Sequence, residues 1–265
     1  MDGYANGFIS FRGVGFRYSE DGPFITHALD LEIRRQEFFT LLGPSGCGKT
    51  TLLNLLAGYE TPTEGEVCVS GKPVRGPGRD RIVIFQAPDS LYPWLTALEN
   101  VDFPLRVAGL SKKERQVRAL QVIELVGLHG HESKYPGQLS GGMKQRVQLA
   151  RALVLEAPIL LMDEPFGALD AQTRAVLQDE LVQIQTRTQR TALFITHDIS
   201  EAIFLADRVG VMSAGPQACI KEIIEVTLPR PRSRGSAAFG QLYDRVNQIL
   251  SDEVRRVLRR EDSLL

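Results

Sequence analysis

The chain has 265 residues, 43% hydrophobic and 24% charged, which is an ordinary composition for a globular protein with a full core. Its 31 Lys and Arg against 32 Asp and Glu give no sign of non-specific nucleic-acid binding. The sequence shows no apolar run near the ~18 residues that span a bilayer, no signal-peptide pattern and no disulfide framework among its three cysteines. We therefore expect a cytosolic compartment.

The first forty residues read as β-structure. Residues 11–18 alternate loosely between apolar and polar, residues 28–33 alternate more cleanly, and residues 65–71 could pair nearby. Residues 37–42 predict a short buried strand, and residues 51–57 predict a helix that Gly58 ends. A glycine-rich stretch separates this strand from this helix.

That stretch fits the pattern G-x-x-x-x-G-K-[ST] in full and reads Gly43-Pro44-Ser45-Gly46-Cys47-Gly48-Lys49-Thr50. A strand that turns through glycines into a helix directs backbone N–H groups and the positive end of the helix dipole at one point. Lys49 would then pair with the β- and γ-phosphates of a nucleotide, and the Thr50 hydroxyl would ligate Mg²⁺. We also expect the helix N-terminus to favour the thiolate of Cys47, so that alkylation inhibits and nucleotide protects.

The character of the chain changes after Gln86. Pro88, Pro93 and Pro104 are expected to break the chain, and helical patterns follow in two stretches, 111–126 and 141–155. This predicts a helical insertion between core strands.

Strands and helices alternate over the rest of the chain. Residues 159–162, 191–196 and 208–213 read as core strands, with a helix near 172–186. The alternation predicts an α/β fold with a mostly parallel sheet covered on both faces. Residues 229–236 form a linker by composition, and the apolar stripe after it is expected to pack on the domain.

Two adjacent carboxylates, Asp163 and Glu164, follow the buried strand 159–162 at its C-terminal end, where ligands bind in such sheets. Asp163 suits the coordination shell of Mg²⁺ together with Thr50. Glu164 can act on the attacking water as a general base. Alone, such a pair is often only two solvated acids at a strand end; the phosphate loop in the same chain favours the functional reading.

A second anion site is predicted at Ser140-Gly141-Gly142. Ser140 is a good helix N-cap, and the two glycines leave backbone N–H groups open at the start of the helix. One nucleotide already held by the first loop does not need this site. As plain structure it is only a capped helix.

Together these motifs resemble the ATP-binding-cassette (ABC) ATPases. The phosphate loop, Leu139–Arg146, the strand with Asp163 and Glu164, Phe166–Asp170 and Ile195–Asp198 occur in that family's order, from about Val14 to Met212. The chain more closely resembles the ATPases of nitrate, sulfonate and taurine importers, because residues 91–101 and the basic proline linker near 229–232 match that group. The resemblance implies a P-loop NTPase core with an N-terminal antiparallel β subdomain and an inserted α-helical subdomain.

The resemblance also implies a role for each matching residue. Tyr18 would stack on adenine, and Phe16 is the alternative candidate for this role. Glu164, His197 and Gln86 would be catalytic. Asp170 would lie in a loop at a dimer interface. Mg²⁺ would be held by Thr50, Gln86 and Asp163. The residues that contact ATP within one chain would be Tyr18, Gly43, Pro44, Ser45, Gly46, Cys47, Gly48, Lys49, Thr50 and Thr51. Ser140, Gly141 and Gly142 would bind the ATP of the opposite protomer.

The implied partners are a second copy of the chain, integral-membrane permease subunits and, indirectly, a periplasmic or surface substrate-binding protein, with no nucleic acid. The expected location is the cytoplasmic face of the inner membrane, as a peripheral protein. Residues 8–228 would form the ATPase domain, with a helical subdomain at about 88–155, and residues 229–265 the linker and an amphipathic helix. Trp94 would line the groove for the permease, unless it is buried in the helical subdomain.

Alternatives remain at this point. A soluble non-transport ABC ATPase would usually carry a second cassette, a coiled coil or a basic surface, and an importer cassette for another small solute would look the same. A GTPase would need an N-K-x-D stretch, which is missing, and the intact acidic pair opposes a non-enzymatic module. His129 and His131 lack an evident third metal ligand and read as a surface loop. Gln36 stands where the family usually has Gly.

Overall fold

The computed structural model describes residues 7–85, 91–167 and 169–262. The chain forms two compact units. The first unit takes the chain up to Arg81 and again from Arg190, and the second unit takes Ile82–Gln189. The second unit is thus inserted into the sequence of the first.

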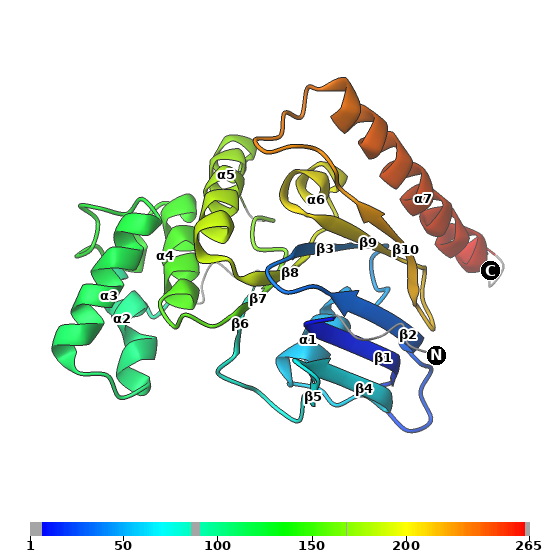
Figure 1. Ribbon diagram of the computed structural model, residues 1–265, viewed down its shortest axis with the longest axis horizontal. Coiled ribbons are helices and arrows are strands. Elements are labelled where there is room, and N and C mark those ends of the chain that lie inside the picture. The colour runs from blue at the N-terminus through cyan, green and yellow to red at the C-terminus, as the bar shows by residue number, and fades with distance from the viewer. Residues whose placement is uncertain (1–6, 86–90, 168, 263–265) are drawn as a thin grey trace. The chain divides into compact units, whose positions relative to one another are not determined.

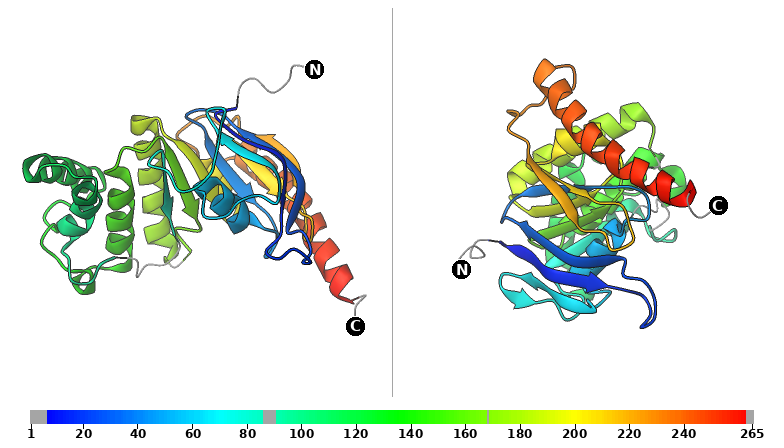
Figure 2. Two further views of the ribbon diagram at one scale, coloured as in Figure 1. Left: turned by 90° about the horizontal axis from the view of Figure 1, so that it is seen from below. Right: turned by 90° about the vertical axis from the view of Figure 1, so that its right-hand side faces the viewer.

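An antiparallel sheet opens the first unit (Figure 1). It contains β1 (Ile9–Phe16), β2 (Thr26–Ile33), β4 (Glu64–Val69) and β5 (Lys72–Pro73), in the order β2-β1-β4-β5. β1 pairs antiparallel with both β2 and β4, so the expected N-terminal β subdomain is present. The views in Figure 2 show these strands side by side.

The second set of strands in this unit is mostly parallel. β3 (Phe38–Leu42) pairs parallel with β8 (Thr191–Ile195) and with β9 (Arg208–Met212), and β10 (Ile220–Glu225) adds antiparallel to β9. Every residue of β3, β8 and β9 is buried. Continuous apolar runs are what a parallel sheet covered on both faces requires.

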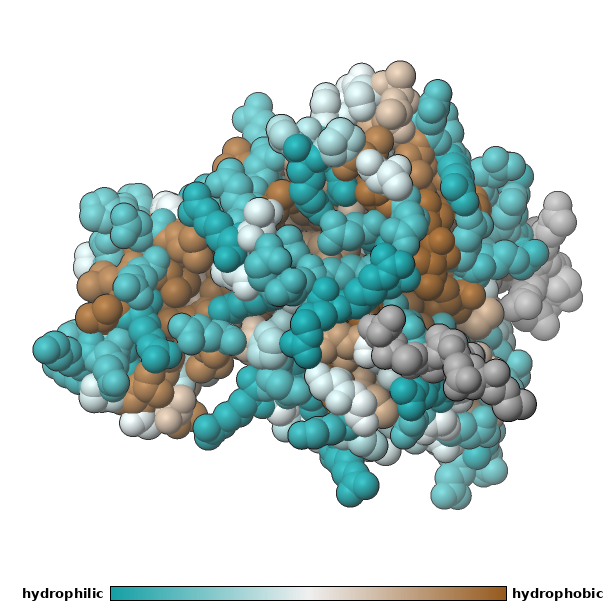
Figure 3. Space-filling view, in the orientation of Figure 1, coloured by the Kyte–Doolittle hydropathy of each residue, from teal (hydrophilic) through white to brown (hydrophobic). Residues whose placement is uncertain are grey.

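Among the described residues, the first unit holds the helices α1 (Lys49–Ala57), α6 (Ile199–Leu205) and α7 (Ala237–Asp262). α7 contacts both α6 and β9, and its Phe239 and Val246 are buried, so part of the apolar stripe packs on the unit as expected. Figure 3 shows an apolar band running beside α7. No helix among the described residues has the length and apolar character to cross a membrane.

The second unit is mainly helical. Its helices are α2 (Ala97–Val107), α3 (Lys112–Leu125), the 3-10 turn η2 (Pro136–Gln138), α4 (Gly141–Leu153) and α5 (Ala171–Thr188). α2 packs on α3 and α4, and α4 packs on α5. The strands β6 (Arg81–Ile84), which begins where one unit passes into the other, and β7 (Ile159–Asp163) are neighbours.

The expectation that Pro104 breaks the chain was wrong, because Pro104 lies inside α2. A proline inside a helix removes one backbone hydrogen bond and costs about 3 kcal/mol. Packing offsets this cost: Val101 and Leu105, on either side of Pro104, are 0% and 2% exposed. Thr96 and Glu99 form a capping box that starts the helix firmly.

Candidate nucleotide site

The phosphate loop connects β3 to α1 in the first unit. α1 begins at Lys49, and its N-cap is Gly48 with a φ of 98°. A Cβ at Gly48 would lie 2.9 Å from Cγ2 of Ile25, so glycine is required there by both conformation and space. The loop therefore brings backbone N–H groups to the start of a helix, as an anion site needs.

Lys49 lies inside this loop, only 9% exposed. Its ammonium donates to the carbonyl oxygens of Gly43 at 2.8 Å and Pro44 at 3.0 Å. The ammonium also lies 4.0 Å from Sγ of Cys47, and these contacts together fix its charge within the loop. Thr50 is exposed and Thr51 is buried at the start of the same helix.

Tyr18 and Phe16 take different places. Phe16 is 4% exposed and belongs to the core, whereas Tyr18 is 67% exposed. The two rings meet edge to face, with centroids 4.9 Å apart, and the Tyr18 hydroxyl lies 3.3 Å from Oγ1 of Thr51. Phe16 thus braces Tyr18, and Tyr18 is the aromatic ring that can still receive a flat ligand beside the loop.

The expectation that the Cys47 thiolate is favoured was wrong. The thiol is 1% exposed, and burial raises its pKa, an effect that the nearby Lys49 charge only partly opposes. Its Sγ contacts Sδ of Met212 at 3.9 Å. Cys47 is therefore a buried packing residue and not a reactive thiolate.

His197 lies at the same edge of the sheet as the phosphate loop. β8 runs parallel to β3 with Ile195 opposite Leu41, so both strands end together. The turn after β8 is held firmly: Thr196 Oγ1 accepts the Asp198 N–H at 3.1 Å and also bonds to Glu201. This turn presents His197, which is exposed.

In the second unit, Asp163 ends β7 and Glu164 follows it, both partly exposed. Glu164 has a φ of 44°, a left-handed conformation that is rare for a residue with a side chain. The Gly167 N–H donates to the carbonyl oxygen of Glu164 at 3.1 Å. Strained backbone of this kind is concentrated at functional sites.

Ser140 is the N-cap of α4, and its Oγ accepts the Met143 N–H at 3.3 Å. Gly142 is buried, and a Cβ there would lie 2.5 Å from Cγ2 of Thr173 on α5. Glycine thus allows α4 and α5 to approach closely. Asp170 caps α5 by accepting the N–H groups of Thr173 and Gln172, and these bonds lower its pKa.

A cavity of about 330 Å³ lies beside this start of α4. Sequence reasoning named Ser140 and Gly142 in its lining but missed the side chains from the following turns of α4 and α5. No local motif marks those side chains, because the packing of the two helices brings them there. They are Met143, Arg146, Gln172, Thr173 and Val176.

Two other expectations concern metal binding. Gln86, expected as a Mg²⁺ ligand and catalytic residue, lies outside the described residues. His129 has Glu132 as its ionic neighbour, at 3.7 Å. Within the described ranges, no group of three or more His, Cys, Asp or Glu side chains could hold a metal ion by itself.

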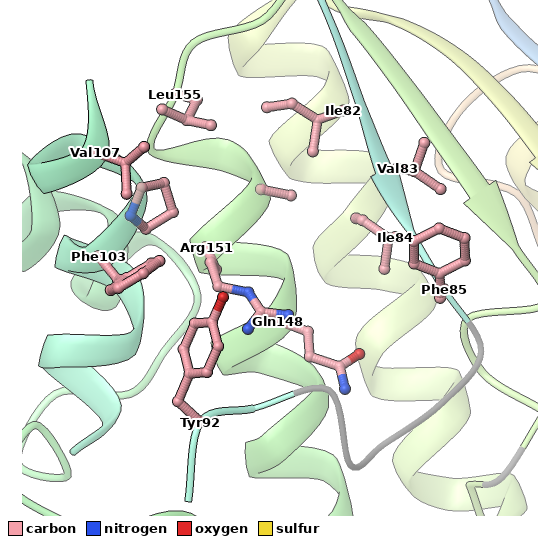
Figure 4. A pocket seen from close by; sticks show the side chains of 12 residues that line it. Ile82, Val83, Ile84, Phe85, Tyr92, Phe103, Val107, Gln148, Arg151 and Leu155 are labelled. Atoms are coloured by element: carbon pink, nitrogen blue, oxygen red, sulfur yellow. The ribbon is translucent and has the colours of Figure 1, made fainter. Parts of the chain in front are cut away.

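An apolar cavity of about 340 Å³ also lies in the second unit, between β6, α2 and α4 (Figure 4). Tyr92 and Phe103 line it, and the guanidinium of Arg151 lies 5.6 Å from the Tyr92 ring. Burial lowers the pKa of Arg151. Trp94 is 70% exposed beside Tyr92, with ring centroids 5.6 Å apart, so Trp94 is on the surface rather than in a core.

Comparison with known proteins decides the family. The sequence model described as ABC transporter matches residues 26–167. The chain belongs to the ABC transporter family. This ABC ATPase is 43% identical over 260 residues to the nitrate import ATP-binding protein NrtD of Synechococcus elongatus, covering 97% of this chain and 94% of that one. It is 47% identical over 231 residues to the bicarbonate transport ATP-binding protein CmpD of Synechocystis, covering 86% and 82%.

A solved structure agrees with this assignment. It is the dimeric, post-hydrolysis state of an ATP-binding cassette bound to ADP and Pi. Its TM-score is 0.69 and its sequence identity 30%, and the match covers 83% of this chain and all of the other. The chain is therefore an ATPase of the ABC type, with the expected P-loop NTPase fold.

Proposed function

We propose that this ABC ATPase energises the import of a small oxyanion, nitrate or bicarbonate, through separate permease subunits. The observation that carries the proposal is the similarity to the nitrate import protein, which runs along 97% of this chain. Nitrate and bicarbonate, the solutes named for the two relatives, are both small planar oxyanions. A sulfonate or taurine, suggested by residues 91–101, is a second cargo class for the same machinery.

The working unit in this proposal is a dimer of two copies. Each chain has two helix N-termini that would bind anions, one at Lys49 and one at Ser140. In this proposal each ATP contacts one N-terminus of each type. The solved cassette that this chain resembles is dimeric. Two copies arranged head to tail would each place the phosphate loop of one chain against the Ser140 turn of its twin.

The residues of each chain would divide the chemistry. Lys49 and the loop N–H groups hold the phosphates, Tyr18 stacks on adenine, and Glu164 takes a proton from the attacking water. His197 and Gln86 orient the γ-phosphate and the water. The Thr50 hydroxyl and the Asp163 carboxylate are hard oxygen donors of the kind that Mg²⁺ takes, and this ion would neutralise charge on the phosphates.

The surface around Trp94 would receive the permease. It combines an exposed tryptophan with an apolar cavity, and large exposed apolar surfaces of this kind mark interaction sites. Aromatic residues are also frequent anchors at protein interfaces. Docking there would place the chain at the cytoplasmic face of the membrane, with a substrate-binding protein on the other side choosing the solute.

A vesicle experiment tests the proposal. The chain is reconstituted in vesicles with candidate permease subunits and a substrate-binding protein from its own organism, and ATP-dependent uptake of labelled nitrate and bicarbonate is measured with wild type and with Glu164→Gln. We expect uptake of one anion with wild type. Glu164→Gln should lower turnover at least ~100-fold, because the base is lost, and leave ATP binding intact.

The two parts of the result are separable. ATP hydrolysis without uptake of either anion would refute the cargo and leave the ATPase in place. Undiminished hydrolysis by Glu164→Gln would remove Glu164 from the mechanism.

A further inference from the structure

The turn between β9 and β10, residues 213–219, lies directly behind the phosphate loop. A methyl group on Gly215 would lie 3.6 Å from the carbonyl oxygen of Gly46 and 3.8 Å from Cα of Cys47. Before the turn, the Cβ of Met212 would be 3.0 Å from a Cβ on Gly43. The back of the loop thus rests on the end of β9 and on this turn.

One side of the turn is hydrogen-bonded to the two residues that directly precede β2. The N–H groups of Gln217 and Ala218 donate to the carbonyl oxygens of Phe24 and Ile25, each at 2.9 Å. Within the turn, the Ser213 N–H donates to the Cys219 carbonyl oxygen at 2.9 Å. These bonds fix residues 217–219, and Ala214, on the other side of the turn, bonds to a further partner.

That partner is Glu253 of α7. Its Oε2 accepts the Ala214 N–H at 3.0 Å, while its Oε1 lies 2.8 Å from Arg256 and 3.7 Å from Lys221. Glu253 is only 1% exposed. Burying a carboxylate is costly unless it is paired and hydrogen-bonded, and these contacts provide both the pairing and the hydrogen bond.

We propose that Glu253 is a positioning residue for ATP binding. It holds the backbone at Ala214, so that Gly215 stays packed against Gly46 and Cys47 and the loop keeps the curvature that directs its N–H groups at phosphate. α7, which begins at Ala237, 187 residues after the loop ends at Thr50, is thereby part of the support of the nucleotide site. The proposal depends on the Lys49 loop binding phosphate.

The test uses the full chain and a fluorescent ATP analogue. Glu253→Ala should raise the Kd for the analogue about three- to tenfold, because the Ala214 N–H loses its acceptor and the turn loosens. The KM for ATP should rise by the same factor, with kcat within about twofold of wild type. Glu253→Gln keeps an acceptor oxygen and should bind within about twofold of wild type.

Val246→Ala is the matched control, since it truncates another fully buried residue of α7 that does not bond to the turn. It should lower the melting temperature without changing the Kd. Lys49→Ala serves as the reference for the loop and should abolish binding. Retained binding in Lys49→Ala would mean that the loop assignment itself is wrong, which separates that failure from failure of the present proposal.

A second perturbation reaches the same contact from the loop side and does not depend on Glu253 variants folding. Gly215→Ala adds a methyl at ordinary contact distance and should be neutral, whereas Gly215→Val should press on Gly46 and weaken binding. Unchanged affinity in both Glu253→Ala and Gly215→Val would overturn the proposal. So would an equal loss of affinity in Val246→Ala.

Discussion

Gln36 adopts a left-handed backbone conformation, with a φ of 62°, in the turn before β3. Its N–H donates to Thr191 Oγ1 at 2.8 Å, which holds the turn against β8. The family that the sequence resembles usually has glycine at this position. The structure supplies the reason, because a residue without a Cβ enters the left-handed region freely.

Gln36→Gly should therefore be more stable than Gln36→Ala by about 1 kcal/mol. Both substitutions remove the side chain beyond Cβ, so the difference reports the strain that a Cβ causes in this backbone conformation. Urea unfolding of the two variants measures it. As a control, Gln248→Gly at an exposed site inside α7 should be less stable than Gln248→Ala by about 1 kcal/mol. A Gln36→Gly variant less stable than its alanine counterpart would refute the strain.

At the scale of elements, the segment 229–236 is more than the linker that its composition predicted. Arg232 donates from Nη1 to the carbonyl oxygens of Ile203, Phe204 and Ala206, at 2.8, 3.0 and 2.6 Å. These groups lie at the C-terminal end of α6, where carbonyls lack partners within the helix. Burial, with some repulsion from Arg230, lowers the Arg232 pKa to about 10, so the group stays charged at neutral pH.

Arg232→Ala should cost about 2–4 kcal/mol of stability, since several buried carbonyls would lose a charged donor at once. Arg232→Lys should recover only part, because an ammonium cannot reproduce the planar fork. Chemical unfolding is the measurement. The control is Arg245→Ala, which breaks an exposed ion pair to Glu222 and should cost under about 1 kcal/mol. Equal losses at both positions would contradict a capping role for Arg232.

At the scale of the whole molecule, each reaction centre of the proposed dimer is built from residues of both chains. Lys49 lies in the first unit and Ser140 in the second unit of the same chain. In the proposed dimer, the two groups that serve one ATP come from opposite copies. A substitution in the phosphate loop of one copy and a substitution in the Ser140 turn of the other copy would then inactivate the same centre. The second centre of that dimer would stay intact.

Mixing two inactive variants should therefore restore activity. Lys49→Ala removes the phosphate-binding charge, and Ser140→Asp keeps an N-cap but places a negative charge against the γ-phosphate. Random pairing makes half the dimers mixed, each with one intact centre, so ATPase activity should recover to roughly a quarter of wild type. Ser140→Asn, a neutral cap of the same size as Asp, should keep more activity alone than Ser140→Asp. No recovery at any mixing ratio would contradict shared centres.

The sequence by itself determined the phosphate loop, the Ser140 helix start and the Asp163–Glu164 pair. These features depend on contiguous residues, because glycine spacing, capping and strand ends act over a few positions. The order of the same motifs also indicated the family and the α/β fold. The short α6 and the edge strand β10 carried too little periodicity to be predicted.

Only the tertiary structure decided which groups face solvent and which are buried. It buries Phe16 and leaves Tyr18 open, and it encloses Cys47 so that its pKa rises rather than falls. It also joins Glu253 to Ala214, residues 39 positions apart. The physical reason is that burial and long-range hydrogen bonds arise from packing between distant segments, and no local pattern records which segments will meet.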